Sequence, residues 1–251
     1  MPKLEDKAPA SMDRFEEAHF HLHAMERFYH LADEFRWSLG GFLRSLKEVP
    51  QLIGMELQKE VGFSAWYKPE RQVLSDDPLL RFLAEHRDFI VHRGMLLPKS
   101  SGVIGITKGR GIKFGLVFPI DPRQSSDTAM RSYLWAIKHV ADDILGVLPD
   151  DDGFEDESTL PCVKRVWRLE PFEEDVLDLC ARAWLRLGEA IRTVALRIGC
   201  EVPHLSLSCL HPSENAQLKL YSRQTLKDWY DQLPDATGDG KSSVIATQSG
   251  G

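Results

Sequence analysis

The chain has 251 residues, of which 43% are hydrophobic and 27% are charged, the balance of an ordinary soluble globular protein. No apolar run approaches the ~20 residues that a membrane-spanning helix needs, and the charged start Met1–Lys7 lacks the apolar core of a signal peptide. The net charge of −7 argues against bulk, non-specific nucleic-acid binding. We therefore expect a cytoplasmic protein without membrane contact.

The four cysteines lie in the second half of the chain without any C-x-x-C spacing: Cys162, Cys180, Cys200 and Cys209. Because nothing indicates secretion, we expect reduced, mostly buried thiols instead of disulfides. The same spacing gives no support to a zinc site, so we predict neither a metal nor a cofactor.

Helical periodicity governs the N-terminal part of the chain. Residues 1–11 carry little apolar surface and predict a disordered leader. From Met12 onward, apolar residues recur at three- and four-residue intervals, which predicts a helix. A second helical stretch is expected from about Ala32 to Val61. Pro50 is expected to kink or split it, because proline removes a backbone donor and clashes with the preceding turn.

A later helix has clear start and stop signals. Asp77 is a good N-cap, and Pro78 suits the first helical position. The apolar pattern then continues to His92, and Gly94 is a typical stop signal. We therefore expect a helix that ends close to His92.

Beyond this helix the pattern changes. Residues 103–118 have β-branched residues on either side of glycines, which predicts a β-hairpin. Further helices are expected at about 126–148, 171–198 and 224–233.

These elements predict a mostly α-helical fold, a helical bundle with a small inserted β-hairpin. The expected organisation is a disordered leader (1–11), a bundle core (12–98), a hairpin segment (99–122), further helices packing on the same domain (123–233) and a disordered tail (234–251).

The most explicit chemistry lies at the end of the helix that begins at Pro78. An imidazole titrates near neutral pH and can move a proton, while a guanidinium can hold a phosphate oxygen bidentately, so Arg87 and His92 suit phosphodiester chemistry. Five residues rotate by ~500° along a helix, so the two side chains point ~140° apart. Alternatively, Arg87 pairs with a neighbouring acid and His92 caps the helix end.

The segment Arg87-Asp88-Phe89-Ile90-Val91-His92 resembles the Arg-x4-His signature of HEPN domains, in which a polar residue follows the arginine. The resemblance spans roughly residues 12–94. It implies a HEPN-like bundle and a metal-independent endoribonuclease whose two Arg–His pairs face each other in a homodimer. His92 would act in proton transfer at the ribose 2′-OH, Arg87 would bind the scissile phosphate, and Asp88 would orient one of them. The resemblance also implies a toxin or defence factor, with an antitoxin or regulatory protein as partner.

A basic stretch follows this motif directly. No acidic residue occurs between Phe89 and Ile120, and the expected RNA-binding residues are Arg93, Lys108, Arg110 and Lys113. Because lysine and arginine neutralise phosphates, we expect this stretch to hold the RNA backbone. A solvated hairpin with ordinary surface lysines is the competing interpretation.

Other interpretations stay open. The chain can instead be a non-catalytic helical module that works through protein contacts, or a nucleotide-binding module in which Arg87 and His92 hold a phosphate. His19 and His23 would share a helix face at a spacing compatible with a metal pair. No Glu-x-x-His motif or nearby cysteine completes such a site, so packing or surface placement is the favoured interpretation for these histidines.

Overall fold

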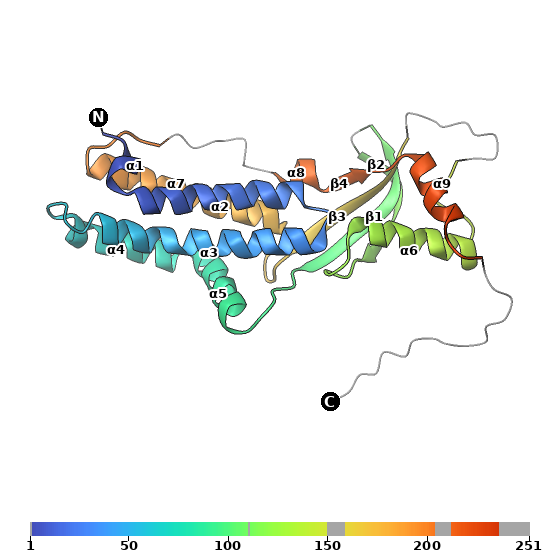
Figure 1. The fold of residues 1–251 in the computed structure, drawn as a ribbon, viewed down its shortest axis with the longest axis horizontal. Coiled ribbons are helices and arrows are strands. Elements are labelled where there is room, and N and C mark those ends of the chain that lie inside the picture. Colours follow the sequence, from blue (N-terminus) through green and yellow to red (C-terminus); the bar gives the residue numbers. More distant parts are fainter. Residues whose placement is uncertain (1, 110, 150–158, 204–211, 236–251) are drawn as a thin grey trace. The chain divides into compact units, whose positions relative to one another are not determined.

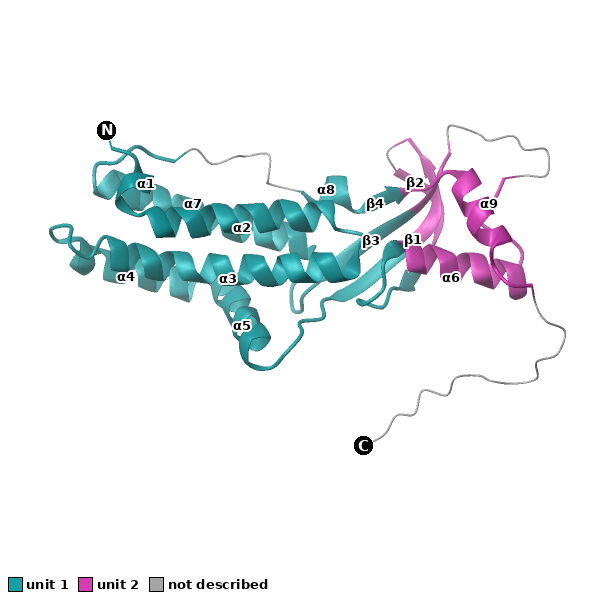
Figure 2. Ribbon diagram, in the orientation of Figure 1, with its two compact units in different colours: residues 1–103, 117–126, 163–219 teal, residues 104–116, 127–162, 220–251 magenta. Residues whose placement is uncertain are grey.

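The computed structural model describes residues 2–109, 111–149, 159–203 and 212–235. The chain divides into two compact units, which Figure 2 colours separately. Unit 1 comprises residues 1–103, 117–126 and 163–219, and unit 2 comprises residues 104–116, 127–162 and 220–251. The elements, labelled in Figure 1, are α1 (Leu4–Lys7), α2 (Pro9–Arg27), α3 (Ala32–Glu56), α4 (Phe63–Asp76), α5 (Pro78–His92), β1 (Lys99–Lys108), β2 (Gly111–Pro119), α6 (Ser126–His139), β3 (Pro161–Arg168), α7 (Val176–Arg197), α8 (Ser213–Ala216), β4 (Leu218–Leu220) and α9 (Arg223–Asp231).

The prediction of a mostly α-helical bundle is wrong. The structure is 58% helix and 15% strand, and its strands form one antiparallel sheet in the order β2-β1-β3-β4, so the fold is mixed α/β. The predicted hairpin exists as β1 and β2, but it is half of a four-stranded sheet and not a small insertion.

The buried Arg165 explains why the apolar pattern of the sequence does not predict β3. Charged residues in the middle of a short segment argue against a buried strand, yet Arg165 is fully buried. Its guanidinium donates to Ser100 Oγ (2.8 Å) and to the carbonyl of Gln124 (2.7 Å), and it stacks over the Trp167 ring at 3.7 Å. These partners satisfy the buried charge, and none of them is visible from the local sequence.

Unit 1 is built on α2 and α3, which run side by side after a short connection (Figure 1), with α7 packed against α2. Two stacked aromatic pairs pack inside this core. Phe15 of α2 stacks on Trp184 of α7 with ring centroids 4.8 Å apart, and Phe35 of α3 stacks on Trp167 of β3 at 4.6 Å. All four rings are buried, and such stacking adds to the free energy gained from burial alone.

Residues 1–11, predicted to form a disordered leader, contain α1 and the start of α2. Leu4 and Ala8 are buried at the four-residue spacing that Met12 continues, so they extend the apolar stripe of α2. Glu56 accepts hydrogen bonds from the backbone of Ala10 (2.8 Å) and Ser11 (2.9 Å), which satisfies donors at the start of that helix. Of the predicted tail, residues 236–251 lie outside the described part of the chain.

Local signals placed several helix boundaries correctly. The Asp77 carboxylate accepts from the backbone N–H groups of Leu79 (2.8 Å) and Leu80 (3.0 Å), as predicted for the N-cap of α5. Gly94 follows the end of α5 with a positive φ of 132°, which confirms the stop signal. Pro50 does not split its helix, since α3 continues through it to Glu56.

Unit 2 contains α6, α9 and the hairpin end of β1 and β2. α6 ends at His139, earlier than the predicted 148. In this unit the hydroxyl of Tyr221 donates to Asp127 Oδ1 (2.8 Å), and the guanidinium of Arg131 lies 4.0 Å from the Trp229 ring centroid. Of the helices in the segment 123–233, α7 and α8 lie in unit 1 with the N-terminal helices, whereas α6 and α9 lie in unit 2.

Candidate functional site

The residues Arg87 and Asp88 lie on the last turns of α5 and interact with each other. Arg87 Nη1 donates to Asp88 Oδ1 (3.2 Å), and Lys47 of α3 donates to the same oxygen (2.5 Å). The two cations hold the pKa of Asp88 below its usual range, and the hydrogen bond from Lys47 is the larger cause. Asp88 is therefore a carboxylate at neutral pH, and Lys47, Asp88 and Arg87 form a cluster with one excess positive charge.

His92 does not join this cluster. It is exposed and is the last residue of α5, and no hydrogen bond or ion pair connects it to Arg87 in the described structure. The five-residue separation along a regular helix accounts for this, since it turns the two side chains to different faces. One copy of the chain therefore does not bring together Arg87 and His92, the predicted catalytic pair.

The predicted RNA-binding residues are spread over both units. Arg93 is exposed at the C-cap of α5 in unit 1. Lys108, at the end of β1, and Lys113, on β2, are exposed in unit 2. Arg110 lies outside the described residues.

A groove lies between α3, α4 and α5 in unit 1, and sequence reasoning missed it. Its volume is about 480 Å³. We call it the leucine groove, because its apolar lining consists of Leu43, Leu46, Pro50, Leu74, Leu80, Leu83, Ala84 and Leu187. Its polar lining consists of Lys47, Gln51, Arg71, Ser75 and Arg81.

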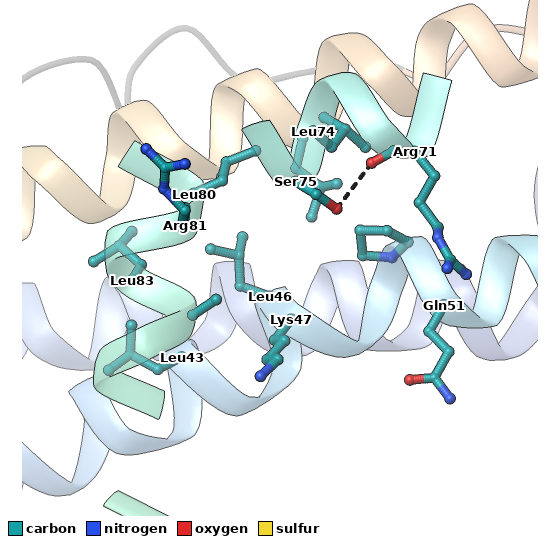
Figure 3. A pocket seen from close by; sticks show the side chains of 13 residues that line it. Leu43, Leu46, Lys47, Gln51, Arg71, Leu74, Ser75, Leu80, Arg81 and Leu83 are labelled. Carbon is teal, nitrogen blue, oxygen red and sulfur yellow. Dashed lines mark hydrogen bonds between the residues drawn. The ribbon is translucent and has the colours of Figure 1, made fainter. Parts of the chain in front are cut away.

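Figure 3 shows how these side chains lie. Leu46 occupies the middle of the groove, with Arg71 and Arg81 at opposite ends. The Arg71 side chain extends toward Gln51, and the hydroxyl of Ser75 donates to the Arg71 carbonyl (3.0 Å) (Figure 3). The groove thus has an aliphatic floor and cationic ends.

The charged side chains that line the leucine groove are all basic. Its lining contains three basic residues and no aspartate or glutamate. Lys47 is already paired with Asp88, whereas Arg71 and Arg81 are exposed and form no ion pair with any described residue. An arginine fork that is not engaged within the protein is well suited to a carboxylate or phosphate supplied by a ligand.

In the described ranges, no group of three or more His, Cys, Asp or Glu side chains could hold a metal ion. Cys162, Cys180 and Cys200 are buried without disulfides, as predicted, while Cys209 lies outside the described residues. Burial raises the pKa of the Cys162 thiol to about 11, so this thiol is protonated at neutral pH.

No described helix is both long and apolar enough to cross a membrane.

Residues 3–106, less than half of the chain, match the model of a family described as Bacteriophage lambda protein ea47. The matched range runs from α1 into β1 and contains the Arg87–His92 segment, and it also contains every residue of the leucine groove except Leu187. No curated protein and no solved structure matches the chain.

The resemblance to HEPN domains is therefore wrong, since the family that matches this part of the chain is a different one. Two fixed residues with a loose spacer recur easily by chance in a helix rich in charged residues. The signature carried no information about the packing of the surrounding helices, which is what distinguishes one helical family from another.

Proposed function

We propose that unit 1 is a non-catalytic interaction module that binds an acidic amphipathic helix of a partner protein in the leucine groove. The observation that carries this proposal is the combination of a leucine floor with cationic ends and no acidic lining residue. Helices that dock in apolar grooves present leucine-like side chains at positions i, i+3, i+4 and i+7. A cytoplasmic location, where buried thiols stay reduced, is part of the proposal.

The lining chemistry favours aliphatic side chains over a nucleotide base. None of the residues that line the leucine groove is aromatic, so a base would find no ring on which to stack. Leucine side chains of a partner would instead be surrounded by leucines of α3, α4 and α5, with apolar surface removed from water on both sides. The volume of about 480 Å³ lies within the usual range of ligand sites.

The two cationic ends supply selectivity. Arg71 and Arg81 stand at the rim, where solvent screens charges, so each contributes little to affinity on its own. Rim charges instead steer the encounter and disfavour partners of the same sign. Buried leucines should therefore set how tightly a helix binds, and the two arginines should select an acidic one.

We expect a labelled amphipathic peptide with leucines at helical spacing and glutamates elsewhere to bind the full-length chain in a fluorescence anisotropy titration. Changing both Leu74 and Leu80 to serine should weaken binding at least tenfold, because both side chains line the groove and are only half-buried in the free protein. Val73→Ser is the matched control, since Val73 is exposed on α4 next to Leu74 and lies outside the groove. Equal binding of a scrambled peptide, or unchanged binding by the double variant, would contradict the proposal.

RNA cleavage is a second candidate function, supported by the surface around His92. Four exposed apolar side chains surround this histidine in the sequence: Phe89, Val91, Met95 and Leu97. Exposed apolar patches of this kind often mark protein interfaces, and a second copy of the chain covering this one would bring two α5 ends together. In addition, Arg87 Nε is buried and has no acceptor among the described residues. In this proposal Arg87 binds the scissile phosphate, His92 transfers the proton, and Lys108 and Lys113 contact the RNA backbone.

The purified protein is then expected to sediment as a dimer and to cut mixed RNA, leaving 2′,3′-cyclic phosphate ends. Arg87→Ala and His92→Ala should each reduce the rate at least 100-fold, since general acid–base catalysis contributes about 10²–10⁴-fold. His139→Ala serves as the control, because His139 is a partly exposed histidine of unit 2, away from α5 in the sequence. Equal cleavage by all four proteins, or no cleavage by the dimeric wild type, would rule out this second candidate.

A further inference from the structure

His19 and His23, one turn apart on α2, bring their ring nitrogens together. Their Nε2 atoms lie 3.1 Å apart. The His19 ring stacks on Trp184, with centroids 4.3 Å apart and planes 12° from parallel, and Trp184 is itself buried against Phe15. The His19 side chain is 22% exposed and that of His23 is 50% exposed. The first ring is thus held by the core, and the second lies beside it at the surface.

The Nδ1 atoms of the two rings face carboxylates. Glu26 Oε2 lies 3.1 Å from His23 Nδ1, and Glu16 Oε2 lies 3.8 Å from His19 Nδ1. The Glu26 carboxylate is at hydrogen-bond distance from His23 Nδ1 and favours the tautomer of His23 that carries its proton there, so His23 Nε2 offers a lone pair. That lone pair faces His19 Nε2 at 3.1 Å, a separation that either a shared proton or a cation bound by both nitrogens can satisfy.

The spacing fits two ligands of one metal ion. Nitrogen ligands bind Zn²⁺ at ~2.0–2.1 Å in tetrahedral geometry, which places two of them ~3.3 Å apart. Metal-bound histidines usually direct their other ring nitrogen to a carboxylate, which fixes the ring and raises its basicity. His23 Nδ1 has such a carboxylate in Glu26 at 3.1 Å, whereas Glu16 lies 3.8 Å from His19 Nδ1, where it contributes charge without a hydrogen bond.

We propose that His19 and His23 form a binding site for a divalent transition metal of the zinc, nickel or copper class, with the two Nε2 atoms as ligands. Imidazole suits these ions, whereas the hard ions Mg²⁺ and Ca²⁺ prefer oxygen. Water or a donor from a bound molecule completes the coordination. Glu26 orients the His23 ring, stacking on Trp184 orients the His19 ring, and both Glu16 and Glu26 add negative charge close to the ion.

Isothermal titration of the full-length chain with ZnCl₂ alone tests the site. We expect one equivalent to bind to the wild type and to His139→Ala, which removes a partly exposed histidine of unit 2. His23→Ala should weaken binding at least tenfold, and Glu26→Gln, which keeps both ligands, should weaken it less. MgCl₂ should give no binding heat. Zn²⁺ should also raise the melting temperature of the wild type and leave that of His23→Ala unchanged.

His23 is half exposed, so its replacement should leave the fold intact, and the far-ultraviolet circular dichroism of His23→Ala checks this. If that variant unfolds, His23→Gln replaces it in the same titration. Continuous-wave EPR with Cu²⁺ gives a separate readout, because two nitrogen ligands produce a resolved hyperfine pattern that the His23 variants should lose. Zn²⁺ binding equal in the wild type and the His23 variants, or its absence in the wild type, would overturn the proposal and leave a hydrogen bond between the two rings.

Discussion

Replacing Asp175 with alanine should lower the free energy of unfolding by about 3–5 kcal/mol, the range for a broken buried polar network. Asp175 is buried and caps α7, accepting from the backbone N–H groups of Leu177 (2.9 Å) and Trp167 (3.0 Å) and from the hydroxyl of Tyr29. Alanine would leave all three donors without their acceptor in the interior of unit 1. Chemical denaturation followed by circular dichroism measures the loss.

Asp175→Asn removes the ionisation of this residue and keeps one of its two accepting oxygens, so the pH dependence of its stability reports the titration of Asp175. Burial raises the pKa of Asp175 to about 6, compared with ~3.9 in an unfolded chain. Between these pH values the folded chain binds more protons, so the contribution of the protonated carboxyl is complete below pH ~4 and is lost as the pH rises through about 6. The stability of the wild type relative to Asp175→Asn should therefore fall from pH 4 to pH 7. Parallel pH curves for the two proteins would contradict this assignment.

The sequence predicted those elements whose signals are local. Asp77 and Pro78 mark the start of α5, and Gly94 marks its end, because each acts through its own backbone conformation or nearest N–H groups. The hairpin of β1 and β2 was predictable for the same reason. In contrast, α1 was not predicted. Its buried Leu4, together with Ala8, continues the apolar stripe of α2, and residues 1–11 considered alone do not show this stripe.

Elements whose stability comes from distant partners were not predictable. β3 contains Arg165, whose burial depends on acceptors ~40 and ~65 positions away in the chain, Gln124 and Ser100. α6 stops at His139 although the apolar pattern continues, and Gly146 then adopts a positive φ of 60°. Hydrophobic periodicity carries no information about these distant hydrogen bonds or about where the backbone turns.

The candidate site likewise has residues that were predictable from the sequence and residues that were not. Arg87 and His92 were recognisable as chemically capable residues, and their angular separation on a helix was also predictable. The leucine groove was not, because α3, α4, α5 and α7 each contribute only a few of its residues, and Leu187 lies more than 100 positions from the others. Leucines that belong to a groove have the same sequence pattern as leucines that belong to a core.

Reversing the charge at both ends of the leucine groove should invert its choice of partner. Arg71 and Arg81 are exposed and form no ion pair with any described residue, so glutamate at both positions changes the field of the groove with little effect on the fold. The leucine floor is untouched, so a helix with the same leucines still has the same apolar contacts. Opposite-sign pairs at a rim are worth about 0.2–1 kcal/mol each, and like-sign pairs cost similar amounts. Two such positions should change the preference between an acidic and a basic peptide by tenfold or more.

The most direct measurement of the proposed function is the ratio of dissociation constants for two peptides with identical leucines, one carrying glutamates and the other lysines. We predict that the wild type binds the acidic peptide at least tenfold more tightly, that Arg71→Glu/Arg81→Glu prefers the basic peptide, and that both preferences shrink at high salt. An unchanged preference in the double variant, or wild-type protein that binds both peptides equally, would show that the leucine groove is not an acidic-helix site.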